Sequence, residues 1–403
     1  MKVLALAVAV VSLGALDLQD SGISQWQDVI RNLRNPDVKV RLEAVQRLGE
    51  AGYTAAAEYV APLLTDPDDR VQAAALDAEL TFFLIESIGG RRVLSFTGGS
   101  RSRAQEAFDA GPAVRTAMAV PVVLLDNLIA AIRDQNARIR FDAIHTLGVV
   151  GEAPLAPAQA KALVDGLDHY DAVMRAATAR VIGRLGVTEA GDKLVAGLND
   201  SNQVVRRYSA EALGLLKEER AVQALTDAAA FYRSNELASE MMLALGRIAH
   251  GSSRDLFRAR LSDTNPVIRG AAAEGLGRLK DRDSLEALRT MSTKDSSQHA
   301  RLAATFAIDR LGEPHAHVIA GALADSDLAA QARSYLIEIG QASVPGITAA
   351  LGVATDGRFR AELVHLLGFV GTRDTIALIE SYNTDRDERV SRAAHDARAR
   401  LAR

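Results

Sequence analysis

A ten-residue pattern that returns about every 31 residues constrains this chain more than any other feature. It reads VRLEAVQRLG at Val40–Gly49, IRFDAIHTLG at Ile139–Gly148, VRRYSAEALG at Val205–Gly214 and IRGAAAEGLG at Ile268–Gly277. A fixed period of this length is typical of a solenoid, in which helical units stack in a row. The working part of such an array is an extended surface and not one central pocket.

The Leu of each Leu-Gly pair sets the register of the repeat. It falls at Leu48, Leu147, Ile182, Leu213, Leu245, Leu276, Ile308, Ile339 and Leu367, and degenerate units start at Val71 and Val390. Apolar residues recur eight before and three after this mark, and small residues four before it, which indicates one buried helix face with a notch. The Gly after the mark costs about 1 kcal/mol inside a helix, so we expect it to admit a neighbouring helix.

A second, shorter helix precedes each of these, for example over 157–167 and 221–229. The sequence therefore predicts an all-α fold, a right-handed α-solenoid of about eleven helix pairs. The pairs are joined by turns rich in Asp, Asn and Pro, which cap helix starts. Asp134, Asp200, Asp263 and Asp295 each lie six residues before an arginine: Arg140, Arg206, Arg269 and Arg301. We interpret this spacing as a structural ladder between units; the alternative is a row of anion-binding arginines.

The Asp-Pro-Asp turn, the Val-Arg pair, the small residue and the Leu-Gly pair at fixed offsets resemble HEAT repeats, in particular the short, phycobilisome-lyase-like variety. The resemblance extends from Ser24 to about Arg403. It implies a curved scaffold that holds other proteins. Two branches of this group carry out chemistry, namely bilin attachment to phycobiliproteins and deoxyhypusine hydroxylation at a di-iron site.

The start of the chain has the pattern of a secretory signal. Lys2 is followed by the uncharged run Val3–Leu16, with small residues near its end. We expect residues 1–16 to be a signal peptide cut after Gly14 or Ala15, and the mature protein to be periplasmic or extracellular. The two alternatives for this segment are an uncleaved membrane anchor and a first buried helix. No other run approaches 18 apolar residues, so no membrane span is expected after cleavage.

The repeat is interrupted once. We divide the chain after the signal into N-terminal repeats at 17–86, a Gly- and Arg-rich insertion at 87–119 and a repeat array at 120–403. The insertion carries Arg91, Arg92, Arg101 and Arg103. Insertions in repeat arrays often map to the binding face, so one hypothesis is a loop that clasps a partner or an anionic group. The other is a decayed repeat or a loop without a role.

Composition argues against several classes of function. The net charge of −4 provides no electrostatic attraction to nucleic acid. The absence of cysteine excludes disulfides and Cys-ligated zinc. There is no His-Glu dipeptide of the kind that holds iron in the hydroxylases. His315 and His317, with Glu313 nearby, form a two-ligand pattern that makes a poor metal site. We expect no catalytic residue, cofactor or metal, and keep a lyase or oxidoreductase as the alternative.

The exposed face of the longer helices suggests a binding stripe. Two residues after the mark stand Arg184, Arg247, Arg278 and Arg310; two before it stand Leu243, Phe306, Ile337 and His365, with Phe369 further along. An arginine column beside an apolar column suits a protein or peptide with acidic and apolar groups. Alternatively, Arg278 pairs with Glu274, and the apolar residues belong to the core. The sequence thus favours an exported, non-catalytic scaffold that binds a protein or peptide on its concave face. The oligomeric state stays open.

Overall fold

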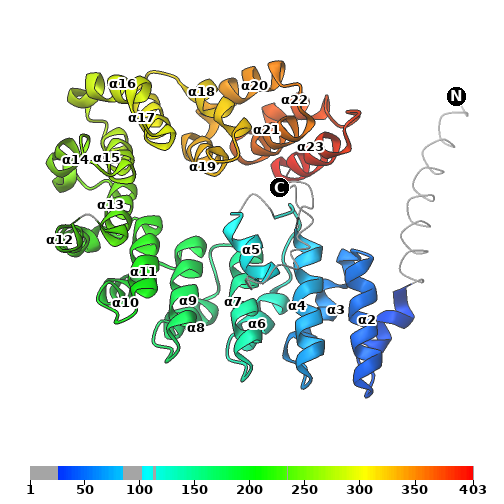
Figure 1. The fold of residues 1–403 in the computed structure, drawn as a ribbon. Helices are drawn as coiled ribbons and strands as arrows, with labels where there is room; N and C mark the ends of the chain where they lie inside the picture. The colour runs from blue at the N-terminus through cyan, green and yellow to red at the C-terminus, as the bar shows by residue number, and fades with distance from the viewer. Residues whose placement is uncertain (1–25, 85–101, 112–114, 234, 403) are drawn as a thin grey trace, which may run out of the picture. The chain divides into compact units, whose positions relative to one another are not determined.

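A computed structural model describes residues 26–84, 102–111, 115–233 and 235–402 (Figure 1). The predicted signal segment lies outside these residues. The chain divides into two compact units. Unit 1 comprises Met1–Leu84 with Val120–Thr146, and unit 2 comprises Ile85–Ala119 with Leu147–Arg403. The described parts of both units consist of helices joined by short turns, which confirms the predicted all-α solenoid.

Unit 1 contains three helix pairs. A helix over 26–32 precedes α2 (Val38–Glu50), and the short helices η1 (Thr54–Ala56), α3 (Ala57–Val60) and η2 (Ala61–Thr65) precede α4 (Asp69–Phe83). The third pair is α6 (Val122–Ala131) with α7 (Ala137–Val150), whose last turn continues into unit 2.

Unit 2 contains α5 (Arg103–Asp109) and eight further pairs, so the described residues hold eleven pairs, in agreement with the predicted number of about eleven. In each pair we call the helical segment that comes first in the chain the first arm, and the helix that follows it the second arm. Their first arms are α8 (Pro157–Gly166), η4 (Thr188–Ala190) with α10 (Gly191–Gly197), η5 (Glu219–Ala221) with α12 (Val222–Tyr232), η6 (Gly251–Ser253) with α14 (Arg254–Arg260), η7 (Arg282–Ser284) with α16 (Leu285–Lys294), α18 (Ala316–Gly321) with η8 (Ala322–Ala324), η9 (Gly340–Ser343) with α20 (Val344–Val353), and η10 (Arg373–Thr375) with α22 (Ile376–Glu380). Their second arms are α9 (Ala172–Leu185), α11 (Gln203–Leu216), α13 (Glu236–Ile248), α15 (Pro266–Arg278), α17 (Gln298–Arg310), α19 (Ala329–Ile339), α21 (Gly357–Val370) and α23 (Glu388–Leu401).

Asp and Asn in the turns start the second arms. The Asn202 side chain accepts hydrogen bonds from the Val204 and Val205 amides, and Asn265 accepts one from Val267 with Pro266 in the first turn of α15. These side chains satisfy amides that have no partner within the helix. The repeated turn composition therefore fixes where each second arm begins.

The register predicted from the Leu-Gly pairs is correct. The mark residues are buried, with Leu213 and Leu276 fully so, except for the half-buried Ile339. Most of the glycines after them lie against alanines of the next second arm. A β carbon on Gly183 would stand 2.8 Å from the Cα atom of Ala212, and one on Gly277 would stand 2.5 Å from that of Ala307. These approaches explain why Gly recurs at a position where it weakens the isolated helix.

Within unit 2 the second arms line the inner side of the row and the first arms lie outside, as seen for α12–α17 in Figure 1. Residues Ala329–Val353 have the length and apolar composition of a membrane span. They form two arms of the array, however, because the chain bends at Gly340, which has a φ of +69°. The residues of the predicted arginine and apolar columns lie on this inner row of second arms.

Candidate binding surface on the inner helices

The repeated arginines of the turns act as a structural ladder. Arg269 donates to the Asp263 and Thr264 carbonyls of its own turn at 2.8 and 3.1 Å. Its remaining nitrogens donate to both carboxylate oxygens of Asp295 in the next turn at 2.7 Å. Arg41 with Asp66 and Arg175 with Asp200 repeat this arrangement. The ladder interpretation is therefore confirmed for Arg269. Arg140, Arg206 and Arg301 donate hydrogen bonds to carbonyls of their own turns.

Two of the four predicted stripe arginines are bound within the fold. Arg184 stacks on the Phe108 ring, with its guanidinium carbon 3.5 Å from the ring centre, and donates to the Phe108 carbonyl at 2.6 Å. Burial lowers the pKa of Arg184 to about 10, and the charge of Arg180 adds to this effect. Arg278 donates to Glu274, Glu338 and the Gly246 carbonyl, each at 2.8 Å. The alternative interpretation of Arg278, pairing with Glu274, is correct.

Arg278 belongs to a hydrogen-bonded network across three second arms. Tyr335 of α19 donates to Glu274 of α15, and Gln331 donates to the Tyr335 hydroxyl at 2.7 Å. His299 of α17 lies 2.8 Å from the Gln331 side-chain oxygen through its Nδ1 atom. Burial raises the pKa of the Tyr335 hydroxyl, and the Glu274 carboxylate raises it further. Because these groups satisfy one another, the network holds the surface in shape.

The other two stripe arginines are less constrained. Arg247 is half-buried and makes no hydrogen bond or ion pair within the described ranges. Its charge acts on Glu240, where it opposes the rise in pKa that burial causes. Arg310 is also half-buried, and its charge reaches Glu338. Burial alone would raise the pKa of Glu338, but the hydrogen bond from Arg278 and the charges of Arg278 and Arg310 lower it. Of the predicted stripe, Arg247 and Arg310 are therefore the two arginines that donate no hydrogen bond in the described residues.

The predicted apolar column is only partly exposed. Phe306 is fully buried and stacks on Tyr335 at 4.2 Å between ring centres, so the expectation that it is exposed was wrong. His365 is also buried and lies 3.4 Å from Asp396. Both positions are covered by the following second arm. Leu243, Ile337 and Phe369 are half-buried, and the Arg400 guanidinium lies 4.0 Å above the Phe369 ring.

The insertion supplies a helix to unit 2. Arg91, Arg92 and Arg101 lie outside the described residues, whereas the exposed Arg103 begins α5. Phe108 of α5 is buried against Gly148 and under Arg184, and Asp109 pairs with Arg180 at 2.8 Å. Sequence reasoning missed Phe108. Its signal is the one large apolar residue in the otherwise polar run after Ser102.

The described end of the insertion contacts the last repeat of unit 2. The Ala117 amide donates to Asp396 at 2.8 Å, and Arg400 donates to the Arg115 carbonyl at 2.9 Å. The insertion therefore packs on α9 through Phe108 and on α23 through Arg115 and Ala117. This accounts for its position in unit 2 and not in unit 1.

A first pocket of about 450 Å³ lies on the inner helices α13, α15, α17 and α19. Leu243, Pro266 and Val267 supply apolar surface, Arg247 supplies charge, and Ser334 and His299 supply polar edges. We call it the Arg247 pocket. It brings together the predicted residues Leu243, Arg247 and Arg278. Arg184, Arg310, Phe306, Ile337, Phe369 and Arg103 lie outside its lining.

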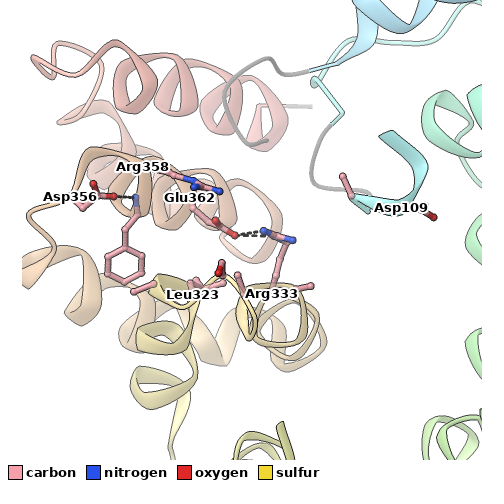
Figure 2. A pocket seen from close by; sticks show the side chains of 12 residues that line it. Asp109, Leu323, Arg333, Asp356, Arg358 and Glu362 are labelled. Atoms are coloured by element: carbon pink, nitrogen blue, oxygen red, sulfur yellow. Dashed lines mark hydrogen bonds and ion pairs between the residues drawn. The ribbon is translucent and has the colours of Figure 1, made fainter. Parts of the chain in front are cut away.

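A second pocket of about 450 Å³ lies between the end of α5 and the helices α19 and α21. Figure 2 shows Asp109 on one side, with Arg333, Arg358 and Glu362 on the other. Arg333 is paired with Glu362, and Asp356 caps α21 through the Phe359 amide at 2.8 Å. We call it the Arg358 pocket. Sequence reasoning missed it because its two sides are more than 200 residues apart in the chain.

The described side chains offer little for a metal. They contain no group of three or more His, Asp or Glu residues placed to hold an ion. His315 and His317 have ring centres 6.3 Å apart, and the Nδ1 atom of His315 lies 2.8 Å from the Glu313 carbonyl. These two histidines therefore do not converge on one point with a third ligand.

Comparison with known proteins gives one family. The family model for HEAT repeats matches residues 160–231 and 233–309. A comparison with curated proteins gives no match. Similar solved structures include an engineered protein, with 18% identity, a TM-score of 0.40 and coverage of 94% of this chain and 99% of that chain.

Two natural proteins are also similar in structure. The complex of CpcE and CpcF of phycocyanin lyase from Nostoc sp. PCC7120 has 19% identity, a TM-score of 0.38 and coverage of 71% of this chain and 97% of that chain. Human deoxyhypusine hydroxylase in complex with glycerol has 21% identity, a TM-score of 0.31 and coverage of 69% and 96%.

Proposed function

Because this chain is a HEAT-repeat protein, we propose that it is a non-catalytic scaffold that binds a protein or peptide on the inner helices of unit 2. The observation that carries the proposal is the Arg247 pocket. It combines Arg247, which donates no hydrogen bond in the described residues, with apolar surface from Leu243, Pro266 and Val267. Exposed apolar surface beside an available arginine is typical of the centre of protein interfaces.

The surroundings of the pocket favour binding over catalysis. Its buried polar groups, Glu274, Arg278 and Tyr335, satisfy one another. A catalytic group needs a reactive atom directed at the substrate, whereas these groups hold three helices in a fixed arrangement. A rigid wall of this kind lowers the entropic cost of binding an extended partner.

Affinity capture tests the proposal. The full chain is immobilised and compared with an Arg247→Glu, Leu243→Asp double variant and with an Arg282→Glu control, whose site is exposed and outside both pockets. We expect one partner to be retained by the wild type and the control and lost from the double variant. A partner retained equally by all three proteins would contradict this location.

The alternative, an enzyme or enzyme accessory of the bilin-lyase or deoxyhypusine-hydroxylase type, makes a different prediction. Stoichiometric iron in the purified protein would replace the scaffold proposal with an oxidoreductase. Export to the periplasm or the outside of the cell is a further part of the proposal. It rests on the pattern of residues 2–16 alone, and the N-terminal sequence of the mature protein tests it.

A further inference from the structure

The two pockets of unit 2 are neighbours on one helix. Ala330 of α19 lines both of them. It is exposed, and the next exposed residue along the helix within the Arg247 pocket is Ser334. Because both side chains are small, α19 forms a low ridge between the pockets. A ligand of modest width can therefore cross α19 and occupy both.

Most of the charged side chains that line the two pockets are already paired within the protein. Each carboxylate of the two linings has a partner: Asp109 pairs with Arg180, Glu362 with Arg333, Glu274 with Arg278, and Asp356 accepts the Phe359 amide. Arg278 and Arg333 are used in these pairs. Arg247 and Arg358 make no hydrogen bond or ion pair in the described part of the chain.

The charge left for a ligand is therefore positive at two points, one in each pocket. An arginine guanidinium binds a carboxylate through two parallel hydrogen bonds. The surface around these points is apolar or small, with Leu243 and Val267 in one pocket and Leu323 and Phe359 in the other. A ligand that matches this arrangement carries two carboxylates joined by a slender, partly apolar segment.

We propose that the inner surface of unit 2 binds an acidic peptide segment laid across α19 at Ala330, with one carboxylate on Arg247 and a second on Arg358. This rests on the proposed function and specifies its ligand. The inference adds Arg358, Ala330 and the second pocket to the binding residues. It also assigns α5 a role, because Asp109 and Ala110 form the far side of the Arg358 pocket.

Fluorescence anisotropy with the full chain tests this directly. The probes are short labelled peptides of Ala and Leu that carry two Glu residues at increasing separation, one Glu, or two Lys residues. We expect one separation of the two Glu residues to bind best. Loss of a charge-assisted hydrogen bond weakens binding by about 10- to 100-fold, so Arg247→Ala and Arg358→Ala should each weaken that peptide to this extent.

The ridge is tested separately. Ala330→Trp should reduce the affinity for the best two-Glu peptide to that for the one-Glu peptide. The matched controls are Ala230→Trp on α12, which is exposed and outside both pockets, and Arg282→Ala. Both controls should bind like the wild type. Circular dichroism and urea unfolding confirm that each variant is folded.

Several outcomes would overturn the acidic-segment proposal. They are equal binding of the Glu and Lys peptides, no binding of any peptide at millimolar concentration, insensitivity to both arginine variants, and displacement of the probe by a single-stranded oligonucleotide but not by the two-Glu peptide. The broader proposal fails differently. If a partner is still lost from the Arg247→Glu, Leu243→Asp variant while the acidic peptides do not bind, the scaffold function stands and its ligand is not an acidic segment.

Discussion

The ring of Phe108 in the insertion lies against Gly148, the glycine that follows one of the repeat marks. A β carbon at position 148 would collide with this ring and with Val181. In most other repeats the glycine at this position faces an alanine of the next second arm, as Gly214 faces Ala244. The Phe108 ring of the insertion thus fills the space beside Gly148, and this contact holds α5 against the repeat array.

Phe108 should stabilise unit 2 through this contact. Phe108→Ala removes a fully buried ring and leaves Arg184 without its stacking partner. We expect a loss of about 3–5 kcal/mol in the free energy of unfolding, measured in urea. Phe231→Ala on α12 is the matched control, because that ring is 79% exposed. Equal losses in the two variants would contradict the packing of α5.

The repeat glycines should not tolerate a methyl group. Gly277→Ala places a β carbon 2.5 Å from the backbone of Ala307, so the helices must separate. We expect a loss of about 1–3 kcal/mol by urea unfolding, in spite of the better helix propensity of Ala.

Gly352 provides the control for this substitution. It is exposed near the end of α20 and has nothing within 4 Å of the position of a β carbon. Gly352→Ala should be neutral or stabilising by up to about 1 kcal/mol. A stabilised Gly277→Ala variant would show that α15 and α17 do not pack as described.

The arginine ladder should make stability depend on acid. The hydrogen bond from Arg269 is the main cause that lowers the pKa of Asp295 below its ordinary value of about 3.9, against the effect of burial. A carboxyl with a lowered folded pKa contributes stability above its unfolded pKa and loses it as the pH falls through the folded value.

We therefore expect the wild type to lose stability as the pH falls below about 4, and Arg269→Ala to lose less over the same range because it lacks this pair at every pH. Arg282→Ala should follow the wild type. Urea unfolding at a series of pH values gives the comparison. Parallel pH profiles for the wild type and Arg269→Ala would contradict a contribution of the Arg269–Asp295 pair to stability.

Glu79 in α4 of unit 1 should have the opposite pH dependence. Its side chain is fully buried, neither carboxyl oxygen has a hydrogen-bond partner in the described residues, and burial raises its pKa well above the ordinary value. A carboxyl with a raised folded pKa binds its proton more tightly in the folded state, so stability falls as the pH rises above about 4.3.

Glu79→Gln keeps the shape and removes this titration. We expect the variant to match the wild type near pH 4 and to be more stable at pH 8 by urea unfolding. A wild type that is more stable than Glu79→Gln at pH 8 would indicate that the carboxylate has a favourable partner.

The architecture could be predicted from the sequence because the apolar pattern of each repeat indicates which face of its own helix is buried. Spacing placed Leu213 and Leu276 in the core and Gly277 in a notch, and both placements are correct. Phe306 was misplaced because its burial depends on Tyr335, which belongs to the next repeat and stacks on it. A single-helix pattern cannot report which neighbour covers a given face.

The binding surface was predictable only in part for a related reason. Arg247 follows from its register position, and so does its neighbour Leu243. Arg278 occupies an equivalent position, but Glu338, two second arms away, binds it. The Arg358 pocket combines α5 with α19 and α21, so it depends on how far the array curves. That curvature is a sum of small rotations between units and has no local sequence signal.

Site-directed crosslinking from Ser334 tests the central claim most directly. Ser334 is exposed in the Arg247 pocket, and Val353, exposed at the end of α20, lies outside both pockets. A photoreactive amino acid is placed at each position in the full chain. A scaffold that binds its partner on the inner helices predicts one crosslinked partner from position 334, lost with Arg247→Glu, and none from position 353. A partner crosslinked from position 353 and not from 334 would contradict it.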